Sequence, residues 1–120
     1  MTDYKADLKK GLDIEKKIIN ELLYLGYNFS YKGTTYLLES IKFIALHPYQ
    51  NTDKLEKNVY PIIANLYKDT VHNVKSNINR ANNAMYYECK IEKMKEYFWL
   101  DRDIKPKVKF VINTILNKIQ

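Results

Sequence analysis

The sequence predicts an all-α fold, a compact six-helix domain that contains a helix-turn-helix, and three observations support this. The chain has 120 residues, which suits one domain around one hydrophobic core. Glycine and proline number three each, which disfavours a turn-rich β protein. Apolar residues recur at intervals of three and four, as they do on the buried face of a helix. We therefore expect six helices and no strand in a single domain over residues 1–120.

The first two helices are predicted over residues 12–25 and 34–45. Gly26 stands where a helix C-cap is expected, and Pro48 follows the second helix. The apolar positions at helical spacing are Ile14, Ile18, Leu22 and Leu25 in the first helix and Leu37, Leu38, Ile41 and Ile44 in the second.

A third helical run is predicted from Thr52 or Asp53 to Tyr67, and Pro61 interrupts it. Proline removes a backbone donor inside a helix but is well tolerated in a first turn. We therefore expect a short piece before Pro61 and the first helix of the motif from Pro61 onward. The positions expected to face inward are Leu55, Val59, Ile62, Ile63 and Leu66.

The next helix is predicted over residues 71–87, after a turn at residues 68–70 in which Asp69 or Thr70 can act as N-cap. Its buried stripe follows from successive spacings of four, three and four residues: Val74, Ile78, Ala81 and Met85. The helix-turn-helix therefore covers about residues 58–87. Short helices over residues 91–98 and 107–119 complete the domain, the last one after Pro106.

The open face of the helix over residues 71–87 is rich in amide and basic side chains, which is typical of a helix that reads DNA bases. Asparagine pairs with adenine, arginine with guanine, and serine with either. An ordinary solvated helix face is the alternative. The predicted base-reading residues are His72, Asn73, Ser76, Asn79 and Arg80, and the predicted phosphate contacts are Lys68, Thr70 and Lys75.

Charge and composition agree with a nucleic-acid partner and argue against other classes. The 18 lysines and two arginines outnumber the 14 acidic residues and give a formal net charge of +6, which favours a polyanionic partner. The single Cys89 cannot form an intrachain disulfide, which indicates a reducing compartment. Since no apolar run approaches the roughly 20 residues of a membrane span and no signal core is present, we expect a cytoplasmic protein.

An enzyme is not expected, and neither is a cofactor or a metal. His47 and His72 are the only histidines, and neither has neighbours that suggest a triad or a metal site. Glu92 and Glu96 lie one turn apart among lysines, as on a salt-bridged helix face. The eleven tyrosines suit either packing or single-strand stacking, and packing is the usual role.

Four short blocks of the sequence match one known family. They are Lys32, Gly33, Tyr36 and Leu37; Tyr60, Pro61, Ile63 and Ala64; Val74, Ile78 and Ala81; and Lys105 with Pro106. In these blocks the chain resembles the effector domain of the stage-zero sporulation master response regulator, which starts endospore formation. The resemblance extends from about residue 12 to residue 119. It implies a DNA-binding helix-turn-helix fold, although fold alone does not determine function.

Two departures from that family matter. Its recognition helix carries an acid-arginine pair followed three residues later by Arg-His, whereas this chain has Lys75-Ser76 and Asn79-Arg80. The chain should therefore read a different, more A/T-rich sequence through Asn73 and Asn79, bind with little specificity, or lack base reading. The family also carries a receiver domain, for which these 120 residues have no room. The sequence is therefore expected to be either an excised domain or a stand-alone protein, and a stand-alone protein would be controlled by abundance or by a partner.

The expected function is that of a sequence-specific, duplex-DNA-binding transcriptional regulator that reads the major groove with the helix over residues 71–87. The alternative is a protein-interaction module that modulates a full-length regulator or RNA polymerase without reading bases. The resemblance implies two copies head to tail on adjacent DNA sites, through terminal helices. We expect a monomer in solution, because such a contact is too small to persist alone.

Overall fold

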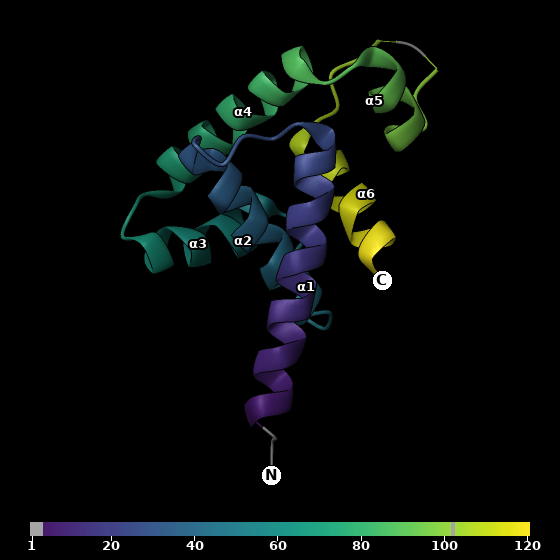
Figure 1. The fold of residues 1–120 in the computed structure, drawn as a ribbon. Helices are drawn as coiled ribbons and strands as arrows, with labels where there is room; N and C mark the ends of the chain where they lie inside the picture. Colours follow the sequence, from purple (N-terminus) through teal and green to yellow (C-terminus); the bar gives the residue numbers. More distant parts are fainter. Residues whose placement is uncertain (1–3, 102) are drawn as a thin grey trace.

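The computed structural model describes residues 4–101 and 103–120, and over these residues the chain is helical without strands (Figure 1). The elements are α1 (Tyr4–Leu25), α2 (Lys32–Leu46), η1 (Leu55–Val59), α3 (Tyr60–Tyr67), α4 (Val71–Glu88), α5 (Ile91–Phe98) and α6 (Val108–Ile119). The described part of the chain therefore contains six α-helices and one π-helical turn, η1, joined by loops. The predicted all-α class is confirmed.

Helix α1 begins at Tyr4, eight residues before the predicted start. Its second half is anchored by Ile18, Leu22 and Leu25, which are fully buried, while its first half projects beyond the other helices (Figure 1). Burial periodicity did not reveal this first half because Leu8 and Leu12 are about half exposed. It is built instead from good helix formers, with an acidic residue in the first turn where the helix dipole favours one.

Gly26 ends α1 as predicted. Its φ of +94° is a left-handed conformation that glycine adopts without a steric penalty. The amide of Gly26 donates to the carbonyl of Leu23, and the amide of Tyr27 donates to that of Leu22. These two bonds satisfy carbonyls that the helix end would otherwise leave open.

Pro61 divides the third helical run, as predicted. The amides of Asn58 and Tyr60 donate to the carbonyls of Lys54 and Leu55, which forms the single turn η1, and α3 then starts at Tyr60 with Pro61 in its first turn. The run begins at Leu55, later than the predicted Thr52 or Asp53. The apolar positions before and after the break therefore do not follow one continuous α-helical stripe.

The prediction that Ile62 and Leu66 face inward was wrong. They are 41% and 61% exposed, respectively, whereas Ile63 and Ala64 of the same helix are buried. Helix α3 packs mainly on α4 and η1. Because one face of a two-turn helix suffices for those contacts, the residues on the other face stay in solvent.

The most extensive packing joins α2 to α4, and Gly33 makes it possible. A Cβ atom at Gly33 would lie 1.8 Å from the backbone oxygen of Asn77, so the two helices cross backbone against backbone. The predicted α4 stripe of Val74, Ile78, Ala81 and Met85 is buried in this core. The position of α4 is therefore set by contact with α2.

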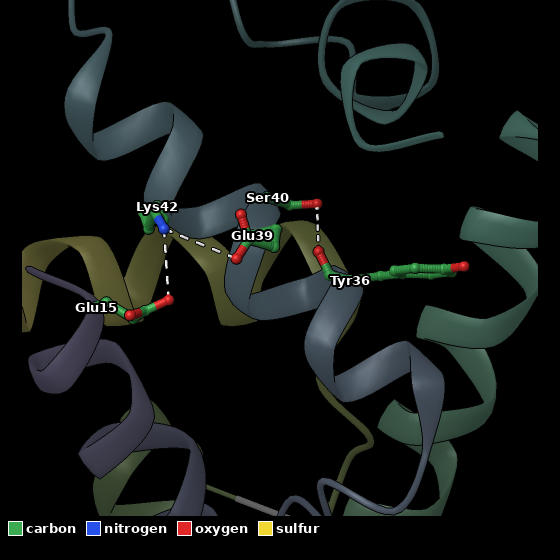
Figure 2. A network of polar contacts seen from close by, with 5 residues as sticks. All are labelled: Glu15, Tyr36, Glu39, Ser40 and Lys42. Atoms are coloured by element: carbon green, nitrogen blue, oxygen red, sulfur yellow. Dashed lines mark hydrogen bonds and ion pairs between the residues drawn. The ribbon is translucent and has the colours of Figure 1, made fainter. Parts of the chain in front are cut away.

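Polar contacts also tie α1 to α2 (Figure 2). The Lys42 ammonium lies 3.4 Å from the Glu15 carboxylate and 3.8 Å from that of Glu39. The buried Ser40 hydroxyl donates to the backbone oxygen of Tyr36 at 2.8 Å. The ring of Tyr36 extends away from this network (Figure 2) and packs at a tilt against Tyr67 of α3, with 5.3 Å between the ring centroids.

Candidate DNA interface

The connection between α3 and α4 has the layout of a helix-turn-helix. The Lys68 amide donates to the Asn65 carbonyl, and the Asp69 amide donates to the Ala64 carbonyl. These two bonds form the Schellman end that commonly precedes a sharp turn. The residue in the left-handed position is Lys68, with φ of 54°, where glycine is the usual choice. The Lys68 side chain is exposed beside the start of α4.

Asp69 holds this turn together. Its carboxylate accepts hydrogen bonds from the Tyr36 hydroxyl at 2.6 Å, the Asn73 amide at 2.8 Å and the Thr70 backbone N–H at 2.8 Å. These bonds, that of Tyr36 foremost, lower the pKa of Asp69 to about 2. Burial and the same hydrogen bond raise the pKa of Tyr36 to about 12. The first turn of α4 is therefore anchored to α2 as well as to α3.

Thr70 is the N-cap of α4, one of the two residues predicted for that role. Its side-chain oxygen accepts from the Asn73 backbone N–H at 3.1 Å. The hydroxyl proton is not used in this bond and stays available as a donor. The predicted contact of Thr70 with a DNA phosphate is therefore compatible with its role as a cap.

The predicted base-reading residues lie on the open side of α4. His72, Asn79 and Arg80 are exposed, as is Asn73, while Ser76 is half-buried. Asn73 differs from the others because its side-chain N–H donates to Asp69. One N–H and the amide oxygen of Asn73 remain available to a base, so Asn73 both orders the turn and stays a predicted base contact.

Lys75, a predicted phosphate contact, is paired in this structure. Its ammonium lies 2.5 Å from the Glu56 carboxylate of η1, and both side chains are about half exposed. Sequence spacing did not indicate this pair, because residues 56 and 75 belong to different elements. A DNA phosphate at Lys75 would have to compete with Glu56.

Asn82 is the main polar residue of α4 that sequence reasoning missed. It is 3% exposed, accepts from the Tyr27 hydroxyl at 2.7 Å and donates to the Pro106 carbonyl at 2.9 Å. One α4 side chain thus joins the segment after α1 to the segment before α6. The only signal for burial was its place four residues after Ile78, at the edge of the apolar stripe.

Lysines from two other segments border the same helix. The Lys105 ammonium donates to the Asn83 amide oxygen at 2.6 Å, and the Lys109 ammonium donates to the Asp53 carbonyl at 2.8 Å. Lys54 and Lys107 line a hollow together with Asn79. These lysines are scattered in sequence, so only the fold brings them to one flank of α4.

The described residues also bear on the predictions about metal ions, membranes and tyrosines. Over residues 4–101 and 103–120, no group of three or more His, Cys, Asp and Glu side chains is arranged to hold a metal ion. Among the helices described, none combines the length and the apolar run that a bilayer crossing requires. The predicted tyrosine roles divide: Tyr27, Tyr36, Tyr60 and Tyr97 are buried, whereas Tyr49 and Tyr87 are largely exposed.

Comparisons with known proteins agree with this geometry. A search of curated proteins found no match. The family described as the C-terminal domain of the sporulation initiation factor Spo0A matches residues 18–119. This match spans α4 and the helices that position it, from the buried half of α1 to the end of α6. The chain therefore belongs to the Spo0A C-terminal family, a family of DNA-binding effector domains that regulate transcription in sporulation.

Proposed function

We propose that this chain is a transcriptional regulator that binds duplex DNA as a single domain and reads bases in the major groove with α4. The observation that carries the proposal is the open face of α4, where Asn79 and Arg80 are exposed opposite a fully buried stripe. A helix anchored on one side and polar on the other matches the docking geometry of recognition helices. Asp69 and Thr70 hold the first turn of that helix, which orients its side chains.

The preferred sequence should differ from that of relatives with the acid-arginine and Arg-His pairs. Ser76 is shorter than arginine and half-buried, so it cannot reach as far toward a base edge. Asn79 and Arg80 then carry most of the discrimination, with adenine and guanine as their natural partners. Asn73 and His72 complete the proposed reading set, and Lys68, Thr70 and Lys75 the phosphate contacts.

Selection of bound sequences from random duplex DNA tests base reading directly. We expect an enriched motif and an affinity that falls steeply with salt, because several lysine–phosphate contacts release counterions. If binding depends on salt but no motif is enriched, the chain binds DNA without reading bases. Undetectable binding at low salt would refute the proposal.

Alanine variants assign the reading residues. Asn79→Ala and Arg80→Ala should each cost roughly 1–3 kcal/mol at the selected site while melting like the wild type, since both residues are exposed. Asn20→Ala removes an exposed asparagine from α1 and is the matched control. Ile78→Asp, which buries a charge in the core, should unfold the motif. Unchanged ratios of selected to scrambled binding in both alanine variants would show that neither residue reads bases.

A second function, contact with RNA polymerase or a full-length regulator, is favoured by one specific observation. Ile62 and Leu66 present apolar side chains to solvent on α3, on the side away from its core contacts. A double variant, Ile62→Ser with Leu66→Ser, should lose capture by such a partner but keep DNA binding. Equal capture by the wild type and this variant would argue against an α3 contact.

A further inference from the structure

We infer that the groove between η1, α4 and the first turn of α6 binds the phosphates of one DNA strand. We also infer that Glu56 competes with these phosphates for Lys75. The inference rests on the proposed function and adds DNA-backbone contacts from Lys54, Lys107 and Lys109, which lie outside the helix-turn-helix. We call this feature the lysine groove. It has a volume of about 480 Å³ and contains Lys54, Lys75, Lys107 and Lys109 together with Asn79 and Glu56.

The lysines of this groove come from three separate elements. Lys54 precedes η1, Lys75 lies on α4, and Lys107 and Lys109 lie at the start of α6. Asp53 and Glu56 supply the only two carboxylates among its lining residues, so the four lysines leave an excess of positive charge. An excess of one sign in a hollow concentrates the opposite charge.

Two hydrogen bonds shape this basic flank. The Lys109 ammonium donates to the Asp53 carbonyl, which holds the start of α6 against the segment before η1. An ammonium has three donors, so two of those on Lys109 remain for an anion. The Lys105 ammonium, bound to Asn83, continues the basic flank in an adjoining hollow that Asn79 and Lys107 also line.

Asn79 connects the groove to base reading. It lines both hollows and is also a proposed base-reading residue of α4. A strand whose bases meet Asn79 would therefore pass its sugar–phosphate backbone along the lysines of the groove. Lysine is a point charge without a fixed fork geometry, which suits sequence-independent contacts to successive phosphates. The chemistry thus fits a DNA backbone that flanks the base-reading helix.

Glu56 weakens phosphate binding in the groove because it already pairs with one of the lysines. Its carboxylate pairs with the Lys75 ammonium, and both residues line the same groove. A phosphate that binds Lys75 must either displace Glu56 or lie close to its negative charge. Removal of the Glu56 charge should therefore tighten binding to any duplex, without a change in base preference.

The experiment compares the salt dependence of duplex binding for variants that remove a charge but keep a polar side chain. Lys54→Gln with Lys107→Gln should reduce the slope of log affinity against log salt by about two, since each lost phosphate contact contributes about 0.9. The ratio of selected to scrambled binding should stay at the wild-type value. Lys16→Gln with Lys90→Gln removes the same charge from exposed positions on α1 and before α5, and its slope should stay near the wild-type value.

Glu56→Gln is the complementary variant, and it should bind both duplexes several-fold more tightly than the wild type. Thermal unfolding by circular dichroism, expected to match the wild type, shows that each variant is folded. Equal slopes for the groove variant and the α1/α5 control would overturn the inference while α4 binding stands. A wild-type protein that binds no duplex would overturn the proposed function as well.

Discussion

Replacement of Gly33 by alanine should push α2 away from α4, the proposed recognition helix. The added Cβ would lie 1.8 Å from the Asn77 oxygen, 2.3 Å from the Asn77 carbonyl carbon and 2.8 Å from the Ile78 nitrogen. An ordinary contact begins at 3.4 Å, so the two backbones must part by about 1.6 Å. All three atoms are backbone, so no rotamer change can relieve the clash.

The cost follows from two opposing effects. Overpacking of a core costs typically about 1–3 kcal/mol, and a clash between backbones belongs at the upper end of that range. Alanine recovers roughly 0.5–1 kcal/mol of helix propensity relative to glycine. The net loss of unfolding free energy should therefore be about 2 kcal/mol, which lowers the Tm of a domain of this size by on the order of 10 °C.

Gly11→Ala is the matched control. A Cβ at Gly11, inside α1, meets nothing within 4 Å, so this variant should gain about 0.5–1 kcal/mol. Urea unfolding at neutral pH measures both changes, and DNA binding by Gly33→Ala reports whether α4 has moved. A Gly33→Ala protein as stable as Gly11→Ala would refute the close crossing of α2 and α4.

Four further outcomes are expected. Lys68→Gly should raise the unfolding free energy by about 1 kcal/mol in urea unfolding, because glycine adopts a φ of 54° without strain. The same variant should bind DNA more weakly in a fluorescence anisotropy titration, because it loses a positive charge. Hydrogen bonds lower the pKa of Asp69 in the folded protein to about 2, against an ordinary 3.8. The ionised carboxylate therefore stabilises the fold above pH 4, and this stabilisation is lost as the pH falls through 2. Between these pH values the Tm of Asp69→Asn should fall less than that of the wild type. Asn82→Ala leaves the buried partners of Asn82 unpaired and should cost roughly 1–3 kcal/mol per group in urea unfolding, whereas the exposed neighbour Asn83→Ala should cost little. Sedimentation should find a monomer without DNA and two cooperatively bound copies on a long duplex; one copy per duplex at every concentration would exclude tandem assembly.

Periodicity and local stereochemistry account for much of what could be predicted. Val74, Ile78, Ala81 and Met85 repeat at helical spacing, so the buried face of α4 follows from the sequence, and so does its exposed face. The break at Pro61 follows from a missing N–H, and the cap at Thr70 from a hydroxyl that precedes a helix. These are short-range effects, which a chain encodes within a few residues.

The sequence by itself thus determined the helical class, the order of the elements and the polar face of α4. Only the tertiary structure decided which residues surround that face, because it depends on contacts between distant segments. The pairing of Glu56 with Lys75, the lysine groove and the burial of Asn82 between Tyr27 and Pro106 all join elements far apart in the chain. The exposure of Ile62 and Leu66 has the same origin, since an apolar side chain is buried only where another element covers it.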